Sequence, residues 1–413
     1  MPLWTRPITL INGRIFTPSG PASRIRFATR ILSLDEAPQR GDLVHDLEGA
    51  FVLPGLINAH DHLELNHYGR LKWREGYGNA SEWIDDMRPR LQRDAAIRAN
   101  SRCALGDRLF IGGLKNLLAG VTTVAHHNPL YRGIHAAVPV RVLRRFGWAH
   151  SFGLQHEPVG ARGEPGGDVR ERYASTAPDV PFVIHAAEGV DRAAADELPH
   201  LAGLGCLRAN TVLVHGVALT VDLWREVIAE GASLVWCPSS NHFLFGRSIP
   251  ARQFLDQAPD GWRHLCLGTD ARVTGSRDLL DEIRCAAGAA DVTPAELLRM
   301  VTTSAARILG LADAGQLDVG VPADLLVIPA LGPDAPRALF ETRRADVSLV
   351  TIDGRPLIGA PAYAPLFEAR GCGASRAVVD DAAKVMDRSL AARVARCPIC
   401  EPGVRAGGSD RHE

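Results

Sequence analysis

The sequence predicts an α/β protein: a distorted (β/α)8 barrel with a small β-sandwich domain formed by both chain ends. Three features favour this fold. The middle of the chain alternates continuously apolar runs with segments of helical periodicity, histidines and acidic residues follow several of those runs, and strand-like segments flank the region on both sides. The predicted limits are 1–50 and 317–370 for the two parts of the sandwich, 51–316 for the barrel, and 371–413 for a C-terminal helix and a disordered tail.

The apolar runs are typical of parallel strands, because both faces of such strands are covered and their residues need not alternate in polarity. The candidate strands are residues 51–62, 121–128, 148–155, 182–188, 212–216, 233–238 and 265–270. Helical segments such as 104–118 lie between them, and this alternation implies a parallel sheet. One further strand, which the pattern does not reveal, would complete the eight-stranded barrel.

The flanking segments predict the second domain. Residues 8–11 form a strand candidate that ends at a turn, Asn12-Gly13, and strands 325–329 and 347–352 follow the barrel region. Since the ends of a domain often lie close together, we expect these strands to share one sandwich. Thr293-Pro294-Ala295-Glu296 predicts a helix start with a capping box. We expect helix in residues 377–395 and disorder in 402–413.

Composition narrows the functional classes. The chain has 413 residues, of which 46% are hydrophobic and 23% charged, as in ordinary globular proteins. A formal net charge of −1 gives no electrostatic reason to expect a nucleic-acid or membrane partner. No signal-like or membrane-spanning apolar segment is evident, and the eight cysteines form no disulfide framework. We therefore expect a cytoplasmic homo-oligomer that acts on a small molecule.

Four short clusters predict one metal site. They are Asn58-Ala59-His60-Asp61-His62, Ile184-His185-Ala186-Ala187-Glu188, Leu213-Val214-His215-Gly216 and Leu267-Gly268-Thr269-Asp270. Each follows an apolar run, and the C-terminal ends of barrel strands are where such barrels carry their chemistry. His60 and His62 are two residues apart in a strand, so their side chains point the same way. Any one of these histidines alone would more often be structural, but four such clusters favour a site.

The predicted metal ligands are His60, His62, His185 and Asp270, which leave one position open for water. This mixture of imidazole and carboxylate suits one divalent ion, Zn2+ or Fe2+, about equally. Glu188 and His215 are then free to move protons, and Asp270 can also accept the proton of the water. We predict that these three residues are catalytic. Glu188 has a simpler alternative, since an acidic residue at a strand end could merely pair with an arginine.

Other polar residues are candidates for substrate binding because they follow predicted strands or lie in loops at the same end. They are His127, Glu64, His242 and Arg272.

The motifs and their order resemble those of the amidohydrolase superfamily. The resemblance rests on the runs 47–49, 52–60, 120–124, 303–310 and 315–324. Within it, the spacing of His185 and Glu188 and the run Cys237-Pro238-Ser239-Ser240-Asn241 are similar to the cytosine/guanine deaminase and triazine hydrolase branch. By the same resemblance, Gln155 occupies a position that carries a substrate-reading glutamine.

The resemblance also bears on the number of metals. Binuclear members of the superfamily bridge two ions with a carboxylated lysine on the fourth strand, whereas this chain has no lysine between Lys115 and Lys384. A single metal ion is therefore expected.

The predicted activity is hydrolytic deamination of an amino-substituted nitrogen heterocycle by metal-activated hydroxide, with Glu188 as the proton shuttle. The alternative is a ring-opening amidohydrolase acting on a cyclic amide of the lactam or hydantoin kind. A non-catalytic barrel used for assembly is a third hypothesis, although such proteins are expected to lose metal ligands.

Overall fold

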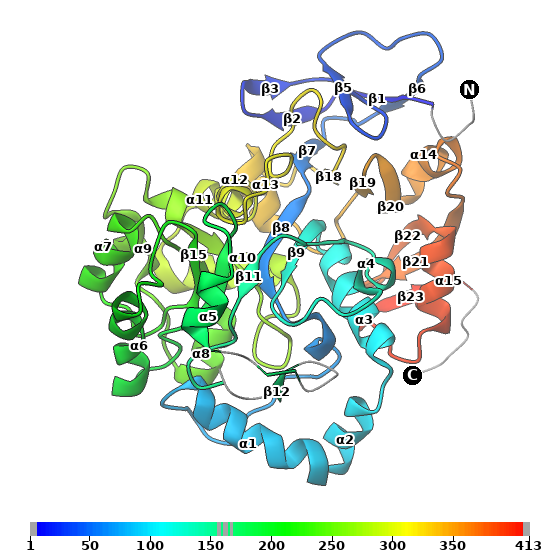
Figure 1. Cartoon of the computed structure of the whole chain (residues 1–413). Helices are drawn as coiled ribbons and strands as arrows, with labels where there is room; N and C mark the ends of the chain where they lie inside the picture. The colour runs from blue at the N-terminus through cyan, green and yellow to red at the C-terminus, as the bar shows by residue number, and fades with distance from the viewer. Residues whose placement is uncertain (1–5, 155–157, 160–163, 166–167, 408–413) are drawn as a thin grey trace.

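The computed structural model describes residues 6–154, 158–159, 164–165 and 168–407. Its parallel strands form two sheet segments, one ordered β10-β9-β8 and the other β11-β14-β15-β16-β17. Their bounds are β8 Leu56–Asp61, β9 Val121–His126, β10 Arg141–Val142, β11 Gly147–Trp148, β14 Phe182–Ala186, β15 Thr211–His215, β16 Ser233–Trp236 and β17 Leu265–Leu267. Figure 1 shows these strands surrounded by helices. The arrangement is a mixed α/β fold of the (β/α)8-barrel type.

The two segments adjoin beyond the end of β17. The backbone N–H groups of Thr269 and Asp270 both donate to the carbonyl of His60, at 3.0 and 3.1 Å. A Cβ on Gly268 would lie 2.6 Å from the Cβ of His60, so only glycine allows this close approach. Two chain segments that are far apart in sequence therefore meet where the predicted metal ligands lie. Closure of the whole barrel between β10 and β11 stays a prediction.

Helices connect the strands, and the first turns of several of them, including α1, α6 and α10, are capped by side chains. Thr293 and Glu296 form the predicted capping box at the start of α11, which is thereby confirmed. The bounds are α1 Ala80–Arg93, α2 Ala95–Ser101, α3 Leu105–Leu118, α4 Ile134–Ala137, α5 Val169–Ala174, α6 Arg192–Gly203, α7 Val221–Ala229, α8 Pro238–Phe245, α9 Ala251–Leu255, α10 Leu279–Ala290, α11 Pro294–Met300, α12 Thr303–Ile308, α13 Ala335–Glu341, α14 Ala364–Ala369 and α15 Arg388–Arg396, with short 3-10 turns η2 Leu63–Leu65, η3 Gly261–His264 and η4 Pro361–Tyr363. None of the helices in the described part of the chain is long and apolar enough to cross a membrane.

Two further sheets lie outside the parallel strands, and the larger one unites both ends of the chain. The four-stranded sheet has the order β5-β4-β1-β6, and the nine-stranded sheet has the order β23-β21-β22-β20-β19-β18-β7-β2-β3. Their bounds are β1 Ile8–Ile11, β2 Arg14–Thr17, β3 Gly20–Ala22, β4 Ile25–Phe27, β5 Ile31–Leu34, β6 Leu43–Asp46, β7 Phe51–Pro54, β18 Leu325–Ile328, β19 Leu349–Ile352, β20 Arg355–Gly359, β21 Ala374–Val379, β22 Ala382–Asp387 and β23 Val404–Ala406, and a separate hairpin pairs β12 Pro158–Val159 with β13 Glu164–Pro165. Residues of both sheets, including Ile8, Phe27, Val52 and Leu325, share one apolar cluster. A β-sandwich made of the two sheets stays a prediction.

Two predicted strands differ from the observed ones. The run 51–62 is divided at Gly55: β7 pairs with β18 and β2, whereas β8 starts the parallel strands, so the barrel begins at Leu56 rather than at residue 51. A Cβ on Gly55 would lie 2.2 Å from the Thr122 side chain, which explains why the turn occurs at glycine. Within the predicted run 148–155, strand among the described residues 148–154 occurs only at Trp148, the end of β11.

The C-terminal prediction was wrong in its detail. Residues 374–379 and 382–387 form the antiparallel strands β21 and β22, and helix occupies only α15. The segment after α15 is also ordered as far as residue 407, because β23 pairs with β21. Residues 408–413 lie outside the described residues. The apolar positions of 377–387 fit alternation as well as helical spacing, and pairing across a sheet decided between them.

A buried polar network connects the C-terminal end of β8 to α3. The ammonium of Lys115, on α3, is fully buried and donates to Asp61 Oδ2 at 3.2 Å, to Asn66 Oδ1 at 2.7 Å and to Thr269 Oγ1 at 3.0 Å. Asn116 also donates to Asp61 Oδ2, at 2.8 Å. The network therefore joins α3, the segment between His60 and His62, and the residue preceding Asp270.

Replacing Lys115 by methionine should leave the Asp61 carboxylate buried without its cation. We expect the free energy of unfolding of the metal-free protein to fall by about 3–5 kcal/mol, measured by chemical denaturation. The double variant Lys115→Met/Asp61→Asn should recover part of the loss, because the unpaired charge is removed. The partly exposed Lys72 gives the control, and Lys72→Met should cost far less. Equal losses at both lysines would contradict the network's importance.

Glu282, on α10, makes stability depend on pH. Its side chain is fully buried and accepts from the backbone N–H of Ser239 at 2.8 Å, and burial raises the pKa of this carboxyl to about 7. A folded-state pKa above the unfolded value contributes stability at low pH that is lost as the pH rises through about 7. Between pH 7.5 and 5 the wild type should therefore gain unfolding free energy relative to Glu282→Gln. The exposed Glu75 serves as control: Glu75→Gln should follow the wild type.

Candidate metal centre and active site

The predicted metal ligands converge at the C-terminal ends of three parallel strands. Nε2 of His185 lies 3.2 Å from Nε2 of His60 and 3.3 Å from Nε2 of His62. Oδ1 of Asp270 lies 3.8 Å from Nε2 of His60 and 3.6 Å from that of His62. His215 also offers a nitrogen within 4.8 Å of those of His60 and His185. The structure thus brings together all four predicted ligands, with His215 beside them.

Hydrogen bonds aim two of these imidazoles inward. Nδ1 of His185 lies 2.8 Å from the carbonyl oxygen of His150, and Nδ1 of His215 lies 2.9 Å from Oδ1 of Asn241. Because both partners are acceptors, each Nδ1 carries the proton and donates it. The Nε2 atoms that face the cluster are then left with their lone pairs, which is the form that binds a metal.

The carboxylate of Asp270 is oriented in the same way. Its Oδ2 accepts from the hydroxyl of Ser240 at 2.7 Å and from that of Thr274 at 2.6 Å. The other oxygen, Oδ1, is left facing the histidines. Although burial acts to raise the pKa of Asp270, interactions with His215 and His62 and the two hydroxyls lower it. Asp270 is therefore an anion at neutral pH.

The electrostatics of the cluster fit a cation. Burial, reinforced by the neighbouring histidines, lowers the pKa of His60 and of His185 well below the usual value, so both rings are neutral. Their inward nitrogens are lone-pair donors held about 3 Å apart, and Nδ1 of His60 is buried without a hydrogen-bond partner among the described residues. Converging neutral imidazoles with one carboxylate match the donor set of a zinc or ferrous site.

Three strand ends at the site have a backbone conformation that favours glycine, although none of the residues is glycine. Ala187, His215 and Asp270 have φ values of 53°, 73° and 52°. A left-handed conformation costs roughly 1–2 kcal/mol for such residues and persists only where the surroundings hold it. In each case it occurs at or just beyond the end of a parallel strand and turns the chain across the cluster.

Glu188 lies next to the cluster but outside the ligand groups found there. Its Oε1 is 3.5 Å from Nε2 of His215. Burial raises the pKa of Glu188 well above its usual value, with further contributions from Asp270 and Glu197. A cavity of about 500 Å³ is lined by both His185 and Glu188. The raised pKa favours the protonated carboxyl, which lies between the cluster and a space that a small molecule can enter.

The predicted substrate contacts divide into two groups. His127 is buried and stacks on His185, with ring centroids 4.3 Å apart and its Nε2 3.0 Å from the carbonyl of Ala149. Glu64 is buried and accepts from Asn128 at 2.7 Å, and Asn128 Nδ2 also lies 3.2 Å from Nδ1 of His62. Both residues are thus near the cluster, where contact with substrate stays a prediction. His242 is exposed on α8, and Gln155 lies outside the described residues.

The prediction for Arg272 was wrong. Its two Nη atoms donate to the carboxylate of Glu401 at 2.8 and 2.6 Å, and Glu401 also accepts from Arg344 at 2.7 Å. Glu401 is only 3% exposed, so the guanidinium of Arg272 is committed to a buried ion pair. The sequence could not indicate this partner, because Glu401 is 129 residues away in a segment next to the expected disordered tail.

Several supporting residues were not predicted. His150 orients His185 through its backbone, so its side-chain type gives no signal. Ser240 and Asn241 belong to a run that was noted only as a family likeness, yet they hold Asp270 and His215. Lys115 and Glu197 lie on helices, where a charged residue is normally a solvent-exposed one.

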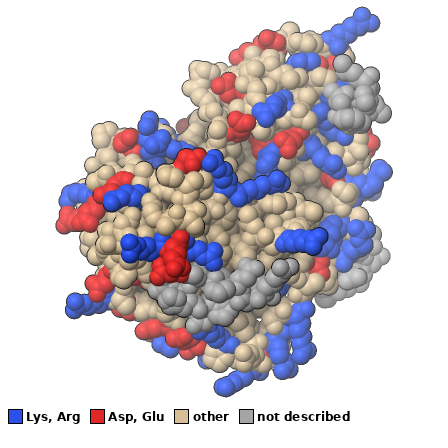
Figure 2. All heavy atoms as spheres, viewed as in Figure 1, with Lys and Arg blue, Asp and Glu red and all other residues tan. Residues whose placement is uncertain are grey.

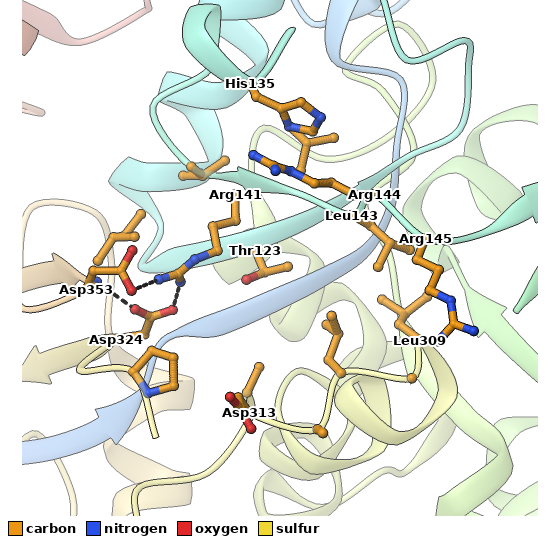
Figure 3. Close-up of a pocket in the computed structure, with 18 of the residues that line it drawn as sticks. Thr123, His135, Arg141, Leu143, Arg144, Arg145, Leu309, Asp313, Asp324 and Asp353 are labelled. Atoms are coloured by element: carbon orange, nitrogen blue, oxygen red, sulfur yellow. Dashed lines mark hydrogen bonds and ion pairs between the residues drawn. The ribbon is translucent and has the colours of Figure 1, made fainter. Parts of the chain in front are cut away.

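A larger cavity than the one beside Glu188 lies elsewhere. Its volume is about 780 Å³, and Arg141, which bridges Asp324 and Asp353, lines it (Figure 3). Pro181, which directly precedes β14, also lines it, so it lies near the N-terminal ends of the strands. It contains none of the predicted site residues. On the outer surface, Figure 2 shows basic and acidic side chains interspersed over the visible face.

Comparisons with known proteins agree with these observations. The pattern of the amidohydrolase family matches residues 173–357. The 5-methylthioadenosine/S-adenosylhomocysteine deaminase of Halobacterium salinarum is 28% identical, over 83% of this chain and 89% of its own.

Solved structures share the fold. A zinc complex of atrazine chlorohydrolase from Arthrobacter aurescens TC1 has a TM-score of 0.66 at 20% identity, covering 85% of this chain and 95% of its own. A zinc-bound adenosine deaminase from Xanthomonas campestris has a TM-score of 0.66 at 19% identity, covering 84% and 92%.

The predicted resemblance is thereby confirmed. The sequence match extends over strands β14 to β17 and their polar ends, which are the segments that carry His185, His215 and Asp270. Residues 173–357 match the amidohydrolase family, the chain resembles the deaminase and triazine hydrolase branch of that superfamily, and it is an enzyme that acts on carbon–nitrogen bonds.

Proposed function

We propose that this enzyme hydrolytically deaminates an amino-substituted nitrogen heterocycle, using one divalent metal ion held by His60, His62, His185 and Asp270. The observation that carries the proposal is the carboxyl of Glu188. It is largely shielded from solvent, its pKa is raised well above the usual value, which favours the protonated form, and it lines the same cavity as the predicted ligand His185. Deamination needs such a proton donor, because the ring nitrogen and the departing amine must both be protonated.

Each residue of the site has a defined part in this reaction. A divalent ion there would supply Lewis-acid activation of water, whose pKa falls to roughly 7 at a zinc site. Asp270, with Oδ2 held by Ser240 and Thr274, directs Oδ1 to take up the proton of the attacking water. Nε2 of His215, 3.5 Å from Oε1 of Glu188, carries a lone pair and is placed to accept a hydrogen bond from the attacking water. Glu188 gives its proton to the ring nitrogen. It then takes up a second proton, which originates from the attacking water, and transfers it to the leaving amine.

The size of the cavity and the relatives suggest which heterocycles to test first. About 500 Å³ exceeds the space that a single aminopyrimidine needs, so a substituted ring or a nucleoside can enter. The relative from Halobacterium salinarum is named for deamination of adenosine derivatives. Aminopurine nucleosides therefore head the series, ahead of free aminopyrimidines, pterins and aminotriazines.

Ammonia release from this series tests the proposal directly. With zinc-loaded or ferrous protein we expect at least one compound to release ammonia, and removal of the metal by a chelator should abolish the activity. The same protein is incubated with cyclic amides of the lactam and hydantoin kind, whose opening releases no ammonia. Opening of a cyclic amide without any ammonia release would move the assignment to a ring-opening amidohydrolase.

Glu188→Gln distinguishes proton transfer from metal binding. We expect its metal content to equal that of the parent, while kcat falls by roughly 10²–10⁴-fold, the usual effect of losing general acid–base catalysis. His60→Ala and Asp270→Ala should instead lose metal and activity together. His215→Asn should keep the metal and lose part of the rate. A Glu188→Gln enzyme that turns over near the parent rate would eliminate deamination with Glu188 as the proton shuttle.

We further propose a closed eight-stranded barrel and a homo-oligomer in the cytoplasm. Support for closure comes from the hydrogen bonds between His60 and the residues after β17.

A further inference from the structure

We propose that Glu197 is a positioning residue that holds the turn between His185 and Glu188 in its working conformation. Its role concerns the backbone that carries both side chains, so for the proton-transfer part it rests on the function proposed for Glu188. Neither the sequence pattern nor the relatives' names pointed to Glu197.

The key contact runs from the turn to a neighbouring helix. Glu197, on α6, accepts a hydrogen bond from the backbone N–H of Ala187 at 2.7 Å. Ala187 is 1% exposed and has a φ of 53°, in the left-handed region that favours glycine. Because alanine is sterically strained there, the conformation needs partners that hold it. The carboxylate supplies one at the strained residue itself.

The other contacts of the turn show what this bond positions. The carbonyl of Ala187 accepts from Ala218 at 2.9 Å, which ties the turn to the segment after His215. The carbonyl of Glu188 accepts from Ala80, the first residue of α1, at 3.1 Å. The turn is therefore fixed on its carbonyl side by two neighbouring segments and on its N–H side by Glu197. Releasing the N–H would let the Ala187 peptide rotate and move Glu188 relative to His185.

The surroundings of Glu197 make an accidental contact a poor explanation. Burial raises the pKa of Glu197 to about 7, although the backbone N–H groups of Ala187 and Glu188 act to lower it. Burying a carboxyl costs free energy unless the carboxyl is hydrogen-bonded, and these backbone N–H groups offset that cost. Glu197 also lines the same cavity as Glu188. The carboxylate oxygen that accepts from the Ala187 N–H therefore belongs to a side chain beside the space proposed for the substrate.

The test uses one variant that removes the hydrogen-bond acceptor of Glu197 and another that removes the backbone strain at Ala187. Glu197→Gln keeps an acceptor oxygen, whereas Glu197→Leu has none. Ala187→Gly removes the steric cost of the left-handed conformation. The exposed Glu226, on α7, provides the matched control Glu226→Leu.

We expect Glu197→Leu to reduce kcat by roughly 10–100-fold, as loss of an outer partner of a metal site does, with little change in KM. Glu197→Gln and Glu226→Leu should stay near the parent rate. The double variant Ala187→Gly/Glu197→Leu should recover much of the loss, a rescue that a general loss of stability would not allow.

Hydrogen exchange gives a readout that does not need substrate. In both zinc-loaded and metal-free protein, the amides of residues 186–189 should exchange faster in Glu197→Leu and remain protected in Glu197→Gln. Parent-like exchange and kcat in Glu197→Leu would overturn the proposal. So would a loss of kcat with unchanged exchange, since Glu197 would then act in proton transfer rather than positioning.

The two proposals can fail separately. If no compound of the series is deaminated, the exchange pattern still decides the role of Glu197. If Glu197→Leu does not fold, the double variant decides: its folding with protected 186–189 amides supports the proposal, and its failure to fold overturns it.

Discussion

The site depends on one electrostatic constraint: several buried imidazoles must remain neutral and direct their lone pairs to one point. Two of the rings are fixed by a protein acceptor on their far side: the carbonyl of His150 accepts from His185, and Oδ1 of Asn241 accepts from His215. The same logic applies to Asp270, whose outer oxygen is occupied by two hydroxyls. The surrounding polar residues therefore serve to define which atoms face inward.

A second property of the site is that its backbone is bent at three strand ends by residues that are not glycine. A strand that continued straight would carry the next side chain away from the cluster. The left-handed residues Ala187, after β14, and Asp270, after β17, turn the chain at the cluster, and Glu188 follows the first of these turns. Each bend lowers stability locally, and the hydrogen bonds around it keep the strain confined to that point.

The local parts of the fold and the convergence of the proposed metal ligands were predictable from the sequence, and the long-range parts were not. Apolar runs followed by histidine or aspartate located β14, β15 and the end of β17. A parallel strand that is buried on both faces is continuously apolar, and polar residues follow at its C-terminal end. The division at Gly55 could not be predicted in this way, because β7 and β8 are both apolar at Gly55 and differ only in the strands with which they pair. Arg272 was misassigned for a similar reason: in the sequence, an arginine near the predicted catalytic aspartate looks the same whether it contacts a substrate or a remote glutamate.

The ion pair of Arg272 with Glu401 has a consequence for how the enzyme is made. Arg272 is synthesised 129 residues before its partner, a delay on the order of 10 s at typical translation rates. Throughout that interval, the nascent chain holds the parallel strands and all the candidate metal ligands but has an unpaired guanidinium in the loop that follows Asp270. A metal ion that bound during this interval would bind before the loop after Asp270 had formed its ion pair. Assembly of the metal centre is therefore expected to be a late event in biogenesis, timed by the arrival of a single carboxylate.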